Sequence, residues 1–97
     1  MARVELTASA VEDLERLILT HSLPIDTKQR FANALLGLRQ FPMLGPALPG
    51  DWSGLRFVLG PWRWMLCVYA YNEYTDTVTI VTVQDGRSSR SATNAGL

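Results

Sequence analysis

Hydrophobic residues recur at two different spacings in the first part of the chain. In residues 2–6 (ARVEL) they alternate with polar residues, which is the period of a β-strand. In residues 7–19 they return every three or four positions, which is the period of a helix with one buried face. The predicted buried positions of this helix are Val11, Leu14, Leu17 and Ile18. The chain therefore opens with a strand and an amphipathic helix.

A second helix is predicted from Asp26 or Thr27 to a point before Pro42, because proline cannot continue a helix. Its predicted buried positions are Phe31, Ala34, Leu35 and Leu38. The link between the two helices contains Pro24 and is short, so the helices are expected to form an antiparallel hairpin.

Both helices begin with residues that are typical of N-caps. Ser9 with Glu12 fits a capping box for the first helix, and Thr7 is the competing N-cap. Asp26 with Gln29 fits a second capping box.

Three strand candidates follow a loop at residues 42–54 that is rich in proline and glycine. They cover residues 55–59, 62–71 and 77–84. The resulting order is β-α-α-β-β-β, and the sheet is the only surface on which the helical hairpin can bury its apolar stripes. We therefore predict an α+β fold in two layers, in which the N-terminal strand and the helical hairpin pack on a three- to four-stranded antiparallel sheet. Residues 1–87 are expected to form a single domain, and the polar segment 88–97 a mobile or loosely docked tail.

Alternation along the predicted strands separates two faces of the sheet. The face expected to pack on the helices carries Leu55, Phe57, Leu59, Trp62, Trp64, Leu66 and Val68. The opposite face carries Met65, Cys67 and Tyr69. Arg56 and Arg63 project from that opposite face, and Arg87 is close enough to join them. Three guanidinium groups on one surface predict an anion site, and the alternative is an ordinary solvated sheet face.

Charge and composition narrow the function. The nine acidic and nine basic residues cancel, whereas proteins that bind nucleic acids through phosphates usually carry a basic excess. All the basic residues except Lys28 are arginines, which suit bidentate phosphate contacts. No metal site is predicted, because one histidine, one cysteine and scattered acids show no ligand spacing.

Neither a secretory signal nor a membrane span is visible in the sequence, so a cytoplasmic protein is expected. Cys67 has no second cysteine to pair with and lies in an apolar strand. It is therefore expected to be a small buried hydrophobe.

Two stretches, GLRFVLGPWRWMLCVY (54–69) and VTIVTVQDGR (78–87), together with the β-α-α-β-β-β order, resemble the RelE/ParE superfamily. These are small toxins of bacterial and archaeal type II toxin–antitoxin systems. The resemblance covers residues 3–90, although the spacing from Arg63 to Tyr69 is longer than is usual in the family. It implies a RelE-like endoribonuclease that cleaves mRNA in the ribosomal A site and needs no cofactor. Arg63 and Arg87 would stabilise charge on the reacting phosphate, while Arg56 and Arg90 would bind RNA.

The sequence departs from the family where a general base is needed. Many ribosome-dependent members have a tyrosine or histidine near the C-terminus, whereas residues 88–93 here contain neither. Asp85 is a candidate base next to Arg87, or else a paired structural group. His21 and Lys28 are expected to be solvated surface residues. Two alternatives therefore stay open: a ParE-like inhibitor of DNA gyrase, and a relative that has kept the fold and lost toxicity.

Each of these readings includes a partner. The resemblance implies a cognate antitoxin, and also the ribosome with its mRNA or, in the alternative, DNA gyrase. Aromatic and large apolar side chains dominate such contacts. The candidate exposed anchors are Trp52, Met65, Tyr71 and Tyr74, and rim packing of the sheet and loops is their alternative.

Overall fold

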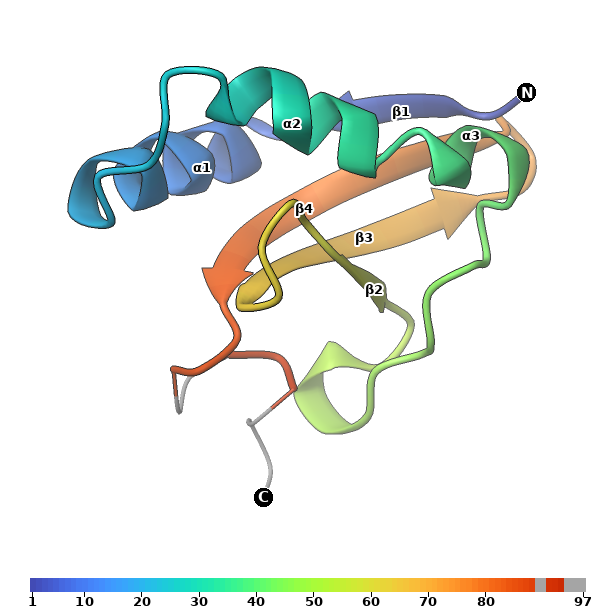
Figure 1. The fold of residues 1–97 in the computed structure, drawn as a ribbon. Coiled ribbons are helices and arrows are strands. Elements are labelled where there is room, and N and C mark those ends of the chain that lie inside the picture. The colour runs from blue at the N-terminus through green and yellow to red at the C-terminus, as the bar shows by residue number, and fades with distance from the viewer. Residues whose placement is uncertain (89–90, 94–97) are drawn as a thin grey trace.

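In the computed structural model, which describes residues 1–88 and 91–93, helices lie on one face of a four-stranded sheet (Figure 1). The elements are β1 (Arg3–Leu6), α1 (Ala8–Thr20), α2 (Thr27–Ala34), α3 (Gly37–Gln40), the 3₁₀ turn η1 (Gly50–Trp52), β2 (Arg56–Leu59), β3 (Met65–Asn72) and β4 (Thr77–Asp85). The predicted α+β class and order of elements are confirmed.

The strands lie in the order β1-β4-β3-β2. The hairpins β2–β3 and β3–β4 are antiparallel, whereas β1 pairs with β4 in parallel, so the sheet is mixed rather than wholly antiparallel. The predicted edge position of the N-terminal strand is confirmed.

The helix ends differ in detail from the prediction. Thr7 caps α1 by accepting a hydrogen bond from the N–H of Ala10 at 3.1 Å, so the capping box at Ser9 is wrong. Asp26 precedes α2 and makes no side-chain capping bond. The predicted second helix is interrupted after Ala34 and continues as α3. No helix in residues 1–88 and 91–93 has the length and hydropathy needed to cross a membrane.

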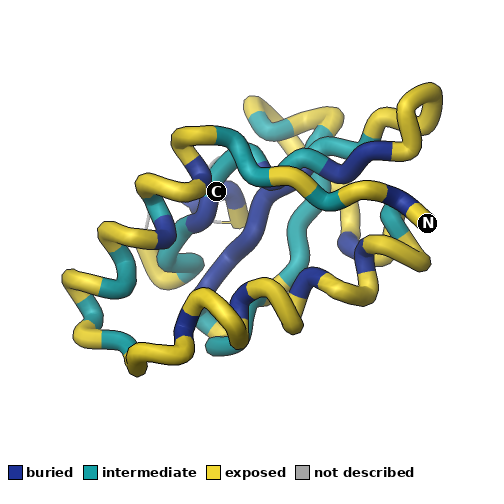
Figure 2. The backbone as a smooth tube through the Cα atoms, turned by 90° about the horizontal axis from the view of Figure 1, so that it is seen from above, coloured by how far each residue is buried: buried dark blue, intermediate teal, exposed yellow. Residues whose placement is uncertain are grey.

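Strand β3 is buried on both faces, and this reverses the predicted orientation of the sheet. Met65, Cys67 and Tyr69 pack toward the helices, in one cluster with Leu14 and Phe31. The opposite face is covered by a second apolar cluster of Leu48, Trp52, Leu55, Phe57, Leu66, Val68, Val81 and Ala92. Figure 2 shows buried backbone running through the middle of the molecule. Because both faces of β3 are apolar, alternation carries no information about which face meets the helices.

Two residues within the predicted tail are packed against the sheet. Ser91 and Ala92 are buried, and the N–H of Ala92 donates to the side-chain oxygen of Gln84 at 2.8 Å. This segment and the loop before β2 together cover the second face of the sheet.

Cys67 is fully buried, as expected. Burial raises the pKa of its thiol to about 12, because the thiolate would be desolvated there. The thiol is therefore protonated at neutral pH and unsuited to nucleophilic chemistry.

A β-bulge interrupts the pairing of β3 with β4. Val68 pairs with Thr82 and the next residue, Tyr69, pairs with Ile80, so Val81 is an extra residue in β4. Such a bulge bends the strand and leaves backbone groups free for other partners.

Helix α1 binds this bulge at two points. The hydroxyl of Thr7 donates to the carbonyl of Val81 at 3.1 Å. The Asp13 carboxylate accepts hydrogen bonds from the hydroxyl of Thr82 at 2.7 Å and from the N–H of Val83 at 3.2 Å. These contacts fix the direction of α1 relative to β4.

Replacing Asp13 with alanine removes the acceptor of both hydrogen bonds. We expect the Asp13→Ala protein to lose about 1–3 kcal/mol in its free energy of unfolding, because two partly buried donors are left without a partner. Urea denaturation measures this loss, with Glu12→Ala on the exposed side of the same helix as the matched control. Equal stability of the two variants would contradict the assigned role of Asp13.

Candidate functional site

Three segments that are distant in sequence meet at the C-terminal end of β4. Asp85, the last residue of β4, pairs with Met65, the first residue of β3. The turn before β3 lies beside it, with the N–H of Gly86 donating to the carbonyl of Trp64 at 2.6 Å. His21, the residue that follows α1, reaches the same place. Figure 1 shows the arrowhead of β4 beside the start of β3.

Asp85 is the centre of a hydrogen-bonded group that we name the His21–Asp85–Arg87 cluster. Arg87 binds the carboxylate of Asp85 in a bidentate manner, with Nε at 3.0 Å from Oδ1 and Nη2 at 2.8 Å from Oδ2. The backbone N–H of Arg87 also donates to Oδ1 at 3.0 Å. His21 Nε2 lies 3.2 Å from Oδ2.

These contacts set the charge of Asp85. The Arg87 guanidinium holds the pKa of this carboxyl far below its ordinary value, against the opposing effect of burial. The Arg87 backbone N–H and His21 lower it further. Asp85 is therefore an anion at any pH near neutrality, and a carboxylate so strongly stabilised is a weak base. The geometry favours Asp85 as a group that orients its neighbours over Asp85 as the general base.

His21 is held on three sides. Its ring stacks on that of Trp64, with centroids 4.4 Å apart and planes at 15°. Nδ1 lies 2.9 Å from the hydroxyl of Thr20, and Nε2 faces Asp85. The side chain is 27% exposed, so the prediction of a solvated surface histidine is wrong. No local pattern could have revealed this, because the contact joins residues 64 positions apart. Lys28, in contrast, is exposed as expected.

Aromatic rings and arginines extend the site along the turn before β3. The rings of Trp62 and Trp64 are 6.4 Å apart, and the Arg87 guanidinium carbon lies 5.1 Å from the Trp64 centroid. Arg30 of α2 lies 5.9 Å from the Trp62 centroid, a contact that the sequence did not reveal. Cation–π attraction favours both placements.

Two of the predicted arginines lie at this end of the sheet and one does not. Arg63 lies in the turn between Trp62 and Trp64 rather than in a strand, and it is exposed. Its side chain has no hydrogen bond or ion pair with any other residue that the structure describes. At the end of β4, Arg63 is therefore unpaired among the described residues and Arg87 is bound by Asp85, whereas Arg90 lies outside the described residues.

Arg56 has a different position from the one expected. It pairs with Tyr69, which is four residues along β3 from Met65, or about 13 Å. Its guanidinium donates to the carbonyl of Gly45 at 2.8 Å, and the N–H of Gly45 donates to the hydroxyl of Tyr69. The prediction that three arginines share one surface is therefore wrong for Arg56, which holds the loop before β2.

The four predicted partner-binding residues do not form one surface. Met65 is fully buried under Gly60 and cannot be an exposed anchor, because it lies on the helix-facing side of β3. Trp52 is half-buried in the second apolar cluster. Tyr71 is half-buried and donates to Asp76 at 2.8 Å, while Tyr74 is 94% exposed.

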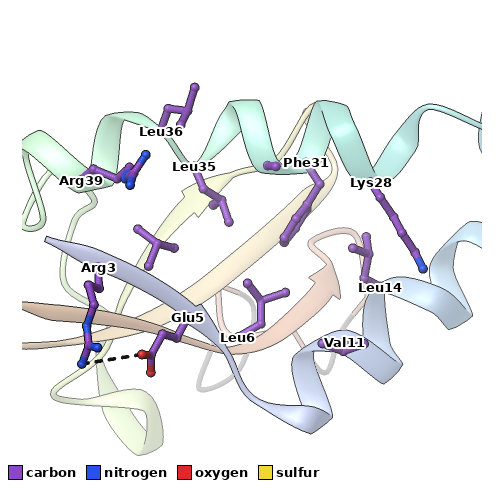
Figure 3. Close-up of a pocket in the computed structure, with 12 residues that line it drawn as sticks. Arg3, Glu5, Leu6, Val11, Leu14, Lys28, Phe31, Leu35, Leu36 and Arg39 are labelled. Carbon is purple, nitrogen blue, oxygen red and sulfur yellow. Dashed lines mark ion pairs between the residues drawn. The ribbon is translucent and has the colours of Figure 1, made fainter.

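A separate apolar groove of about 660 Å³ lies between β1 and the helices (Figure 3). We name it the β1–helix groove. Its apolar lining includes Val4, Leu6, Val11, Leu14, Phe31 and Leu35. Arg3, Lys28 and Arg39 also line it, with Glu5 as the one acid. The groove thus combines an apolar floor with mainly basic neighbours.

Comparison with known proteins relates the fold to one family. No family model and no curated protein sequence matches this chain. Among solved structures, a chain of the RelBE2 toxin–antitoxin complex of Mycobacterium tuberculosis is 22% identical with a TM-score of 0.67. The alignment covers 87% of this chain and 96% of that one.

Two further structures are similar. A chain of the chromosomal ParDE toxin–antitoxin system of P. aeruginosa is 17% identical to this chain, with a TM-score of 0.65. The alignment covers 88% of this chain and 96% of the ParDE chain. A chain of the archaeal RelE–RelB complex of Pyrococcus horikoshii is 19% identical to this chain, with a TM-score of 0.58. The alignment covers 90% of this chain and 98% of the chain in that complex. The protein described here therefore shares its fold with these chains of the RelBE2, ParDE and RelE–RelB structures.

Proposed function

We propose that this protein is the toxin of a type II toxin–antitoxin system and that it cleaves mRNA on the ribosome. The observation that carries the proposal is the His21–Asp85–Arg87 cluster, with the exposed Arg63 in the adjoining turn. This arrangement joins guanidinium groups with an imidazole, the side chain that most often transfers protons in enzymes. It lies at one exposed end of the sheet, within reach of a large substrate.

RNA cleavage by the 2′-hydroxyl requires stabilisation of the charge that develops on the phosphate. Arg63 is free to supply it. Arg87 uses Nε and Nη2 on Asp85, and its Nη1 has no partner among the described residues. Arginine presents five N–H donors, so Nη1 can bind a phosphate oxygen while the fork to Asp85 stays intact.

The neutral net charge is compatible with this proposal because one arginine at the site has no acidic partner among the described residues. Arg30 is paired with Asp26 and Arg87 with Asp85, whereas Arg63 lies in the adjoining turn and makes no ion pair with a described residue. Glu73 and Asp76 lie in the β3–β4 turn, at the other end of the same strands. A local basic field can attract a phosphate even where the total charge is zero.

The β1–helix groove supports the partner part of the proposal. We propose that a segment of the antitoxin fills it, with apolar side chains on the groove floor and acidic residues near Arg3, Lys28 and Arg39. The similar RelBE2 and RelE–RelB structures are complexes of toxins with antitoxins. This surface is distinct from the end of β4, so the antitoxin would need a second contact to cover the active site.

Inhibition of DNA gyrase is the second candidate function. It is favoured by the likeness to the ParDE structure, whose TM-score of 0.65 is close to the 0.67 of RelBE2. Such an inhibitor would act by binding and would need no proton transfer.

Induction of this protein alone in a bacterial host tests these possibilities. We expect growth to stop, translation to fall, and translated mRNAs to be cut at codon boundaries, because the site is built for RNA cleavage. Growth rate, amino-acid incorporation and mapped mRNA ends measure this outcome. Filamentation with a DNA-damage response and intact mRNA would favour gyrase instead. Normal growth with soluble, folded protein would contradict a toxin role.

Replacing Arg63 with alanine tests the anion site directly. We expect cleavage of ribosome-bound mRNA to slow by about a hundred-fold or more, the usual effect of removing a donor that stabilises transition-state charge. The fold should be unchanged, because Arg63 is exposed and lies in a turn. Arg39→Ala, an exposed arginine on α3, is the matched control and should cleave normally. Normal cleavage by a folded Arg63→Ala protein would exclude Arg63 from the site.

A further inference from the structure

We propose that His21 is the proton-transfer residue of this site, with Nδ1 as the reacting nitrogen and Asp85 as its positioning residue. This inference rests on the proposed function, in which a base must take the proton of the attacking 2′-hydroxyl. It supplies from the end of α1 the group that residues 88–93 lack. Candidates in other parts of the fold are weaker, since Cys67 is fully buried and Lys28 lies on the groove.

The position of His21 is fixed by the backbone as well as by its ring. It caps the C-terminus of α1, with its N–H donating to the carbonyl of Leu17 at 3.0 Å. The next residue, Ser22, has a positive φ of 50°, so the chain turns away immediately after the histidine. The C-terminal end of a helix favours a positive charge, which helps an imidazole there to accept a proton.

The shorter of two contacts at Nε2 selects one neutral tautomer. Asp85 Oδ2 lies 3.2 Å from Nε2 and an anionic carboxylate can only accept, whereas the Arg87 Nη2 donor is farther away, at 3.5 Å. In the neutral ring the hydrogen is therefore on Nε2. The other tautomer would place the lone pair of Nε2 next to the negatively charged carboxylate. The lone pair is then on Nδ1.

Nδ1 already has a hydroxyl at hydrogen-bonding distance. The Thr20 hydroxyl lies 2.9 Å from it and is exposed, so a hydroxyl group of a substrate could take its place. An incoming RNA 2′-hydroxyl would then donate to the same nitrogen. The Thr20 side chain thus marks the place from which a proton can be abstracted.

The proposed step is balanced without any further reagent. The 2′-oxygen forms a bond to phosphorus while its proton moves to Nδ1 of His21, and the bond from phosphorus to the 5′-oxygen breaks. The products are a 2′,3′-cyclic phosphate and a 5′-hydroxyl. The proton taken up by His21 returns to the 5′-oxygen directly or through solvent water. Nη1 of Arg87 and the Arg63 guanidinium bind the phosphate oxygens throughout.

The charged groups around His21 decide to which residue a pH dependence of cleavage is assigned. The charged groups that face the ring are Asp85 and Arg87 at the end of β4, while Thr20 of α1 and Trp64 of the turn are uncharged. Asp85 stays anionic because Arg87 holds its pKa low. Arg87 stays cationic. A pH dependence of cleavage that the wild type shows and His21→Gln lacks therefore belongs to His21.

The test uses the full chain and 70S ribosomes programmed with a synthetic mRNA of defined sequence and an empty A site. Single-turnover cleavage is measured across the pH range for the wild type, His21→Gln and Asp85→Asn, with Glu12→Gln on α1 as the control. Glutamine keeps an amide that can donate to Asp85 but cannot transfer a proton. We expect His21→Gln to cleave more slowly by roughly a hundred- to ten-thousand-fold. Its cleavage rate should also lose the pH dependence that the wild type shows.

Asp85→Asn keeps the histidine and removes the neighbouring anion. We expect slower cleavage with the pH dependence retained, because the histidine stays but loses the carboxylate that positions it. Glu12→Gln should match the wild type.

The outcomes separate the two proposals. No cleavage by the wild type would overturn the proposed function together with this inference. If His21→Gln cleaves at the wild-type rate and with the wild-type pH dependence, the role of His21 alone is overturned.

Discussion

The attachment of α1 to the bulge in β4 determines where the proposed site lies. Thr7 binds the carbonyl of the extra residue Val81, and Asp13 binds the hydroxyl of Thr82 and the N–H of Val83 next to it. A helix attached at two points has a fixed direction, so its last turn has a fixed place. That place brings His21 to Asp85, 64 residues later in the chain.

The electrostatics of the site follow from one carboxylate shared by two basic side chains. Asp85 is gripped by Arg87 and faces His21, so it orders both groups without neutralising the whole site. Arg87 is 63% exposed and Arg63 is also exposed, which leaves positive charge at the surface. The proposed phosphate transfer uses these features: the proposed base His21, donors for developing charge, and access for a large substrate.

The sequence predicts most of the fold because its local signals agree with one another. Hydrophobic periodicity gives the order of elements, and Thr7 is a good N-cap by residue type. The face of the sheet that meets the helices was predicted wrongly. Because β3 is apolar on both faces, the pattern did not show whether Met65 faces the helices. His21 was also missed, since its contact with Asp85 is purely tertiary. Arg56 matched the family pattern, yet a loop carbonyl binds its guanidinium.

The most direct test of the central claim is a cryo-EM structure of the protein on a programmed 70S ribosome. The A-site codon would carry a 2′-O-methyl group that blocks attack. The account predicts that the C-terminal end of β4 faces this codon, with Arg63 and Arg87 within hydrogen-bonding distance of the scissile phosphate and His21 beside the blocked oxygen. Docking through any other surface, or no binding in the A site, would contradict it.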